Sequence, residues 1–203
     1  MSVRDIELYG PQFDFVTAEE HYLAFVAGIG SGKTLSGSAR ALAATQGYIG
    51  RQRIRTPNLG IVTAPTYPML RDVTIRSFLE MAEGLVKDYN KSESRITMRN
   101  GSEILFRSTE HPERLRGPSI SWWWGDEAAL YLPNVWQIMI GRLRQYGLHG
   151  WAWITTTPKG RNWIWQRFVQ AVRKGYRLFK TSTLANPYLD KEFVQALVED
   201  YVG

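Results

Sequence analysis

A glycine-rich turn between a short apolar run and a small-residue stretch constrains the fold of this 203-residue chain more than any other feature. The apolar run, residues 22–27 (YLAFVA), predicts a buried strand, and the Ala-rich stretch from Thr34 onward is compatible with a helix. The turn between them consists of Gly28, Ile29, Gly30, Ser31, Gly32 and Lys33. A strand, such a turn and a helix in that order are the setting of a phosphate-binding loop.

Each residue type in this turn suits the binding of a nucleotide's phosphates. Glycines let successive backbone N–H groups surround a phosphate, and the helix N-terminus adds its positive dipole end. Lys33 would reach the β- and γ-phosphate oxygens, and Thr34 would offer its hydroxyl to Mg²⁺. The pattern G-x-x-x-x-G-K-[ST] is met except that Ala27 replaces the first glycine. A structural Gly/Ser-rich turn is the alternative, but Gly-Lys-Thr at a helix start favours nucleotide binding.

The rest of the chain alternates predicted strands and helices. Strands are expected at residues 58–64, 120–125, 151–156 and 176–181, and helices at residues 67–85, 134–145 and 161–173. The buried face of the first helix would consist of Leu70, Val73, Phe78, Met81 and Leu85. Residues 96–106 predict a hairpin around Asn100-Gly101. The fold class is therefore α/β, with a mainly parallel central sheet, helices on both faces, a β-hairpin insertion, and ligands at the carboxyl ends of the strands.

Two adjacent carboxylates, Asp126 and Glu127, follow the apolar segment at residues 120–125 (ISWWWG). At the end of a buried strand, Asp126 could hold Mg²⁺, and Glu127 could orient and deprotonate an attacking water. The alternative is an ordinary helix N-cap with an acid in the first turn. Together with the glycine-rich loop, the pair predicts ATP hydrolysis. The size of the three tryptophans predicts packing against helices on both faces of the sheet.

Composition excludes several classes of chemistry. No cysteine is present, so thiol catalysis, thiolate zinc sites and disulfides are ruled out, and the three histidines are too scattered for a zinc site. No signal peptide and no apolar run of membrane-spanning length are found. We therefore expect no membrane partner and a reducing cytoplasmic setting.

The charge of the chain is unevenly distributed. The net charge is +6, and residues 128–189 contain no Asp or Glu. The same stretch carries Arg142, Arg144, Lys159, Arg161, Arg167, Arg173, Lys174, Arg177 and Lys180. These residues form either a solvated basic face balanced by acids elsewhere, or a surface that meets phosphates or an acidic neighbouring subunit.

In their order along the chain, these motifs resemble those of the ATPase domain of tailed-phage large terminase subunits. The resemblance covers nearly the whole chain. It rests on Gln12 before the first strand, the loop AGIGSGKT, the APTY sequence at residues 64–67, NGSEILF at residues 100–106, ERLRG at residues 113–117, WWWGDEAAL at residues 122–130, and TTTP at residues 155–158.

The resemblance implies a P-loop NTPase of the ASCE/RecA-like type that hydrolyses ATP with Mg²⁺ to translocate double-stranded DNA into a procapsid. It implies a homo-oligomeric ring on the portal, with the portal protein and the small terminase subunit as partners, in the host cell cytoplasm. By the same resemblance Gln12 contacts adenine, Arg116 is a trans-acting finger, and Thr155, Thr156 and Thr157 couple hydrolysis to motion. The alternatives are a helicase-like nucleic-acid-remodelling ATPase and a non-catalytic nucleotide switch.

Some residues depart from the family pattern or have a simpler explanation. Ile29 stands where the family often has an arginine, so a cis arginine at the γ-phosphate is not expected. Arg116 and Arg114 could merely solvate the turn before Pro118. The threonine run could reflect β-propensity alone.

The predicted organisation is one ATPase domain at residues 1–185 and a C-terminal helical segment at residues 186–203. Asn186-Pro187-Tyr188 would open this terminal helix. The resemblance implies that the segment is a lid or linker toward a nuclease domain that the chain lacks. We expect no nuclease activity, because the acids beyond residue 127 are confined to this helix: Asp190, Glu192, Glu199 and Asp200.

Overall fold

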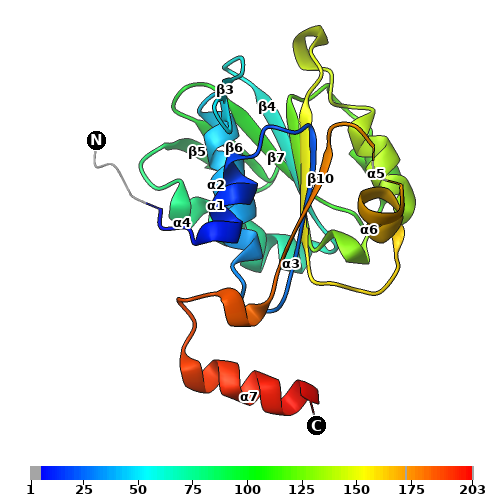
Figure 1. Ribbon diagram of the computed structural model, residues 1–203. Coiled ribbons are helices and arrows are strands. Elements are labelled where there is room, and N and C mark those ends of the chain that lie inside the picture. Colours follow the sequence, from blue (N-terminus) through cyan, green and yellow to red (C-terminus); the bar gives the residue numbers. More distant parts are fainter. Residues whose placement is uncertain (1–5, 172, 203) are drawn as a thin grey trace.

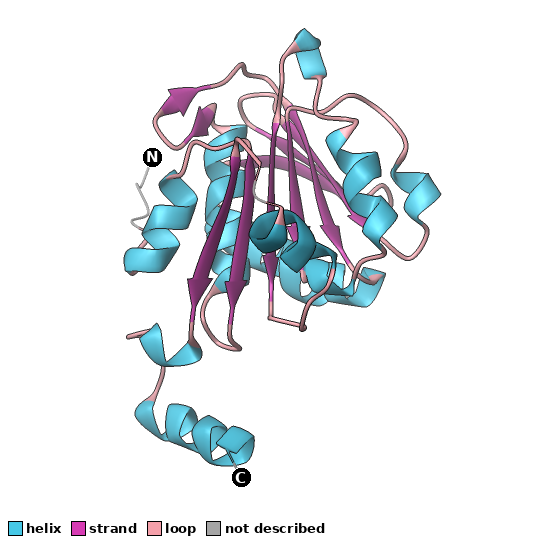
Figure 2. Cartoon of the chain, turned by 45° about the vertical axis from the view of Figure 1, so that its right-hand side comes forward, coloured by secondary structure: helices cyan, strands magenta, loops and turns pink. Residues whose placement is uncertain are grey.

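The computed structural model describes residues 6–171 and 173–202. Its centre is an eight-stranded sheet with the order β10-β1-β9-β8-β4-β7-β6-β5 (Figures 1 and 2). The strands are β1 (Tyr22–Ala27), β4 (Leu59–Ala64), β5 (Val86–Asn90), β6 (Arg95–Met98), β7 (Glu103–Ser108), β8 (Trp122–Asp126), β9 (Trp151–Thr156) and β10 (Tyr176–Thr181). Strands β10 through β7 in this order pair in parallel, whereas β5 and β6 are antiparallel. The predicted mainly parallel sheet with a hairpin is confirmed.

Helices cover both faces of the sheet. One core cluster joins α1, α2 and α4 to the sheet, and a second joins α5, α6 and η5 to the opposite face (Figure 1). The helical elements of the first face are α1 (Gly10–Thr17), α2 (Lys33–Thr45), α3 (Tyr67–Met69), the π turn η1 (Leu70–Ile75) and α4 (Arg76–Met81). Those of the second face are α5 (Pro133–Ile140), α6 (Trp163–Trp165) and the π turn η5 (Gln166–Gln170).

The three tryptophans of β8 alternate between the two faces, as strand geometry requires. Trp122 and Trp124 belong to the first core cluster and Trp123 to the second, and all three are fully buried. The prediction that they pack on both faces is confirmed. Glycines make room for the large rings: a Cβ on Gly37 would lie 2.3 Å from Trp124, and a Cβ on Gly60 would lie 2.1 Å from Trp122.

Several predicted boundaries were wrong. The helix expected at residues 134–145 ends at Ile140, and a 3₁₀ turn, η4 (Gln145–Gly147), follows it. The helix expected at residues 67–85 ends at Met81 and contains the π turn η1, which leaves Val73 52% exposed instead of buried. Strand β5 had no clear signal, because it is a polar edge strand that pairs only with β6. Helix α1 was not expected either.

The remaining elements lie at the edges of the domain. These are β2 (Tyr48–Ile49), β3 (Gln52–Arg53), and the 3₁₀ turns η2 (Pro112–Leu115), η3 (Ala128–Leu130) and η6 (Thr183–Ala185). Helix α7 (Lys191–Val202) stands apart from the layers, beyond the sheet edge where β1 and β10 end (Figure 1). It starts at Lys191 rather than directly at Asn186. Within the described ranges, every helix is too short or too polar to cross a membrane.

Candidate active site

The glycine-rich turn joins β1 to α2 with two residues in the left-handed region. Gly30 has a φ of 72° and Gly32 a φ of 74°, and L side chains rarely adopt such values. Ala27 lies within β1 with its side chain buried. Because strand geometry suits any L residue, an alanine fits where the family pattern has its first glycine. The loop therefore keeps glycine at the positions where the backbone requires it.

Lys33, the first residue of α2, is 7% exposed and points its ammonium into the loop. Its Nζ donates to the Gly28 carbonyl oxygen at 2.9 Å and lies 4.0 Å from Glu127 Oε1. Burial lowers the pKa of Lys33, and the charges of Glu127 and Asp126 oppose this effect. An ammonium has three donors, so after the bond to Gly28 it retains the capacity to bind an anion in the loop.

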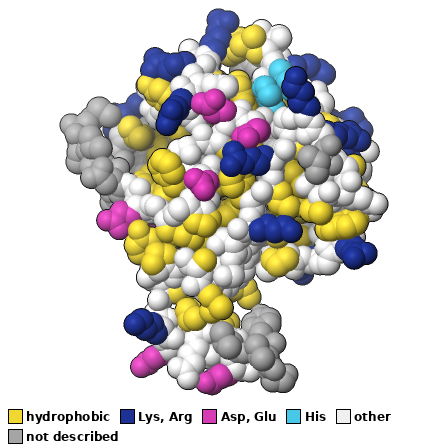
Figure 3. Space-filling view, in the orientation of Figure 1, with side chains coloured by type: hydrophobic (Ala, Val, Ile, Leu, Met, Phe, Trp, Pro, Cys, Tyr) yellow, Lys and Arg dark blue, Asp and Glu magenta, His cyan; other side chains and the backbone are white. Residues whose placement is uncertain are grey.

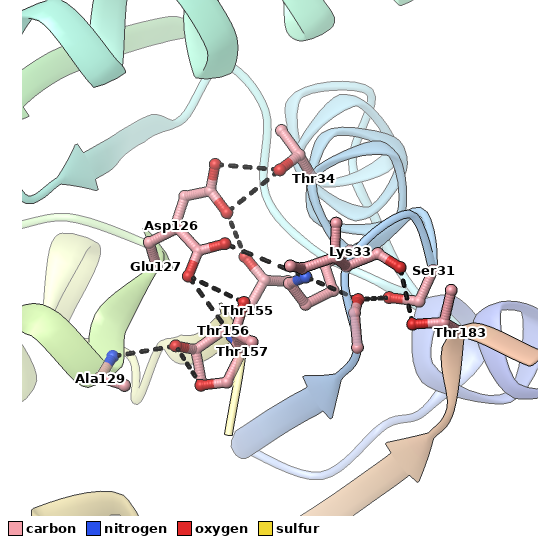
Figure 4. A network of polar contacts seen from close by, with 12 residues as sticks. Ser31, Lys33, Thr34, Asp126, Glu127, Ala129, Thr155, Thr156, Thr157 and Thr183 are labelled. Atoms are coloured by element: carbon pink, nitrogen blue, oxygen red, sulfur yellow. Dashed lines mark hydrogen bonds and ion pairs between the residues drawn. The ribbon is translucent and has the colours of Figure 1, made fainter. Parts of the chain in front are cut away.

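Asp126, the last residue of β8, is 2% exposed and receives hydroxyl donors from three different elements. Figure 4 shows two of these donors, Thr34 and Thr155. Thr155 donates to Oδ1 at 2.8 Å, and Thr74 donates to Oδ2 at 2.9 Å. Thr34 lies farther away, at 3.4 Å from Oδ1 and 3.2 Å from Oδ2. Burial raises the pKa of Asp126 to about 6, although the bonds from these hydroxyls act in the opposite direction.

Glu127 occupies a left-handed backbone conformation, with φ 50° and ψ 42°. Such a conformation is uncommon for a residue other than glycine, and strained residues cluster at functional sites. The Glu127 side chain makes no capping hydrogen bond to η3. Instead, Glu127 Oε2 accepts from the backbone N–H of Thr157 at 3.3 Å and lies 3.5 Å from its hydroxyl. Glu127 therefore stands at the N-cap position of η3, but its side chain contacts Thr157 instead of capping the turn.

The predicted coupling residues contact both carboxylates. Thr155 lies opposite Asp126 in the register of β8 and β9, which places its hydroxyl against that carboxylate. Thr156 Oγ1 accepts from the backbone N–H of Ala129, and Thr157 contacts Glu127. The run therefore has specific contacts beyond those that strand propensity alone would give (Figure 4).

The carbonyl groups of the loop are held from two sides. Gln12 of α1 is buried, and its Nε2 donates to the Ser31 carbonyl oxygen at 3.1 Å. From the C-terminal segment, Thr183 Oγ1 donates to the Ile29 carbonyl oxygen at 2.8 Å, and Asn186 Nδ2 donates to that of Gly30 at 2.7 Å. Helix α1 and the C-terminal segment thus both contact the loop.

A cavity of about 550 Å³ adjoins the loop on the side of the C-terminal segment. Its walls come from Gly28 and Ile29 of the loop, Thr157 and Pro158 after β9, and Leu197 of α7 among others. Figure 3 shows hydrophobic side chains at the junction between the domain and α7. The loop, the threonine run and the C-terminal helix therefore border one space.

Arg116 lies outside this polar network. Its side chain is 62% exposed, and its Nε lies 2.5 Å from Glu113 Oε2. The other predicted site residues, from Gln12 to Thr157, are brought together at one edge of the sheet. Several residues that sequence reasoning missed contact them, among them Thr74, Thr183, and Tyr131, whose hydroxyl lies 2.7 Å from the Asp126 carbonyl oxygen. None of these three belongs to a motif that marks its role.

The basic residues of the acid-free stretch lie on several elements. Arg161 packs over Trp165, Arg167 over Trp136, and Arg177 pairs with Glu20. On the face seen in Figure 3, Lys and Arg side chains are dispersed over the domain, and acidic side chains lie between several of them.

The donor set at this edge fits Mg²⁺ bound together with a nucleotide. Among the described residues, no three His, Cys, Asp or Glu side chains form a metal cluster. Protein-bound Mg²⁺ commonly uses one or two carboxylates and completes its coordination with phosphate oxygens and water. The carboxylate of Asp126 and the hydroxyl of Thr34, which lie 3.2 Å apart beside the glycine-rich loop, meet that requirement.

Comparison with known proteins identifies the family. The sequence model of the phage terminase large subunit matches residues 76–202, more than half of the chain. The chain belongs to the phage terminase large subunit family. The resemblance drawn from its motifs is thereby confirmed.

Individual terminases show the same relationship. The large subunit of the PBSX phage terminase from Bacillus subtilis (strain 168) is 27% identical over 180 residues, which cover 86% of this chain and 40% of that protein. The large terminase of a thermophilic bacteriophage, solved in complex with ADP, superposes with a TM-score of 0.79 at 17% identity over 95% of this chain and 50% of that one. The large terminase ATPase domain of Thermus phage P74-26 gives a TM-score of 0.69 at 18% identity, covering 96% of this chain and 86% of that one.

The chain corresponds to only part of the length of these relatives. The chain spans about 40% of the curated PBSX relative and half of the ADP-bound terminase. The similarity to the solved structures establishes that the terminase chain has the fold of a terminase ATPase domain, which confirms the predicted ASCE/RecA-like fold class.

Proposed function

We propose that this terminase chain binds and hydrolyses ATP with Mg²⁺. The observation that carries the proposal is the single network in which Lys33, Thr34, Asp126 and Glu127 meet at the glycine-rich loop. ATP and Mg²⁺ are the ligands that such a loop and carboxylate pair recognise. The ADP complex of the thermophilic phage terminase, which has the same fold, supports this assignment.

Each residue has a distinct role in the proposal. The backbone N–H groups of residues 28–32 and the ammonium of Lys33 neutralise the phosphate oxygens, while Asp126 and Thr34 hold the metal, which would screen the charge of the β- and γ-phosphates. Glu127 accepts a proton from the attacking water. The bond from the Thr157 N–H to Glu127 Oε2 orients this carboxylate. Gln12, which contacts the loop at Ser31, recognises the adenine.

We further propose that hydrolysis drives double-stranded DNA into a procapsid, as membership of the terminase family suggests. Thr155, Thr156 and Thr157 would transmit the loss of the γ-phosphate, because Thr155 contacts Asp126, Thr157 contacts Glu127, and Thr156 lies between them and contacts Ala129. The proposed partners are the portal protein, the small terminase subunit and further copies of this chain in a ring, in the host cytoplasm. Family membership favours packaging over a helicase-like alternative.

Two further parts of the proposal concern the periphery of the site. Arg116, exposed on the surface, would stabilise the transition state at a neighbouring subunit's ATP. Residues 1–185 would form the ATPase domain, and residues 186–203 would act as a lid or linker. The bonds from Thr183 and Asn186 to the loop support a link between this segment and the nucleotide.

Two substitutions test the ATPase assignment. Lys33→Ala should abolish ATP turnover, because no other described cation lies in the loop to replace the ammonium. Glu127→Gln should retain ATP binding but lose about a hundredfold or more in turnover, as expected when a positioned base is removed. Turnover is measured by phosphate release with linear duplex DNA, and binding by calorimetry.

Lys87→Ala and Glu80→Gln, on the exposed faces of β5 and α4, serve as controls and should match the wild type. Wild-type turnover in Lys33→Ala would refute the assignment of the loop. Loss of binding with retained turnover in Glu127→Gln would show that Glu127 is structural.

A further inference from the structure

The helical segment at residues 67–81 contains a π turn at the level of the Asp126 carboxylate. Thr74 lies within this turn and is 1% exposed, whereas its neighbour Val73 is 52% exposed. Burial of apolar surface alone would favour a buried Val73 and an exposed Thr74, because a hydroxyl loses its hydration when it is buried. π turns occur frequently at functional sites. The π turn thus contains a threonine, Thr74, whose hydroxyl is buried inside the protein.

The buried hydroxyl of Thr74 has a specific partner. It donates to Asp126 Oδ2 at 2.9 Å, while Thr155 donates to Oδ1 at 2.8 Å. Each carboxylate oxygen therefore has one short hydrogen bond. Thr34, at 3.2 and 3.4 Å, is shared between the two oxygens and is the weakest of the three donors.

The element that carries Thr74 is also attached to the helix that follows the loop. Ser77 Oγ of α4 lies 3.2 Å from Ser38 Oγ of α2. Helix α2 begins with Lys33 and Thr34. The segment at residues 67–81 therefore contacts both sides of the proposed metal site, the carboxylate through Thr74 and the loop helix through Ser77.

We propose that Thr74 is a positioning residue for metal binding. Its hydroxyl, placed by the π turn, keeps the Asp126 carboxylate oriented when the Thr34 hydroxyl turns from Asp126 toward Mg²⁺. The inference rests on the proposed ATPase function and adds a residue to it. Groups that orient a metal ligand typically change metal affinity by about 10–100-fold when they are removed.

The test compares substitutions that differ in one hydroxyl. Thr74→Val removes the hydroxyl at nearly constant volume, and Thr74→Ser retains it. Thr45→Val is the matched control, because Thr45 is fully buried on α2 and its hydroxyl bonds the Leu42 carbonyl oxygen away from the site. Calorimetry then measures the binding of a non-hydrolysable ATP analogue, once with Mg²⁺ and once in EDTA, so the result does not depend on turnover.

In Mg²⁺, Thr74→Val should bind the analogue on the order of tenfold more weakly than the wild type. In EDTA the two should bind it equally. Thr74→Ser and Thr45→Val should match the wild type in both conditions. If Thr74→Val does not fold, as judged by near-UV circular dichroism, Thr74→Ala makes the same comparison without the added methyl group.

Equal binding by the wild type and Thr74→Val in Mg²⁺ would overturn the positioning role. An equal loss in EDTA and in Mg²⁺ would also overturn it, because the defect would then be structural. If the wild type binds no analogue in either condition, the proposed function fails and this inference fails with it.

Discussion

The buried carboxyl group of Asp126 should make the stability of the metal-free protein depend on pH. Burial raises its pKa from the ordinary 3.8 to about 6. Between these values the folded protein keeps the proton while the unfolded chain releases it, so the free energy of unfolding falls as pH rises. A difference of about 2 pK units corresponds to about 3 kcal/mol. This contribution is fully present below about pH 4 and is lost as pH rises through 6.

Asp126→Asn keeps the shape of the side chain and removes its charge, so it removes this dependence. Urea unfolding in EDTA, from pH 4 to 8, gives the free energy of unfolding of both proteins. The stability of Asp126→Asn relative to the wild type should rise by about 3 kcal/mol between pH 4 and pH 7 and then stay constant. Asp88→Asn, on the exposed edge strand β5, is the control and should follow the wild type.

Parallel pH profiles for the wild type and Asp126→Asn would refute the argument. A wild type that gains stability relative to the variant as pH rises would show that the bonds from Thr34, Thr74 and Thr155 outweigh burial.

Two further predictions concern packing and assembly. Gly60→Ala should lower the free energy of unfolding, measured in urea, by about 3 kcal/mol, because the added Cβ would lie 2.1 Å from the Trp122 ring. Gly10→Ala is the control and should change the free energy of unfolding little, because a Cβ added there would meet no other part of the protein within 4 Å. Equal stability of the two variants would contradict the packing argument. Mixing Glu127→Gln protomers, which keep Arg116, with Arg116→Ala protomers, which keep Glu127, should restore part of the DNA-dependent ATP turnover if the two residues serve one site from different chains. No rescue in a confirmed assembly would contradict a role of Arg116 in trans.

The local features of the site could be predicted from the sequence because they depend on neighbouring residues. Gly30 and Gly32 supply the left-handed backbone of the loop, and the Asn100-Gly101 turn joins β6 to β7. The alternation of apolar runs with helical stretches indicated a parallel sheet. In such a sheet the carboxyl ends of β1 and β8 meet at one edge, so the loop and the acid pair had to lie close together.

Other parts of the site depended on the tertiary structure. Thr74 lies 52 positions from Asp126 in the sequence, and nothing in its neighbourhood distinguishes it from Val73 as a buried residue. Regular helical spacing selected Val73, but the π turn, which packs against α2, β4 and β7, buries Thr74 instead. The contacts of Thr183 and Asn186 with the loop likewise join segments that are far apart in the sequence. Such contacts depend on how helices and strands pack in three dimensions, and local periodicity carries no information about that packing.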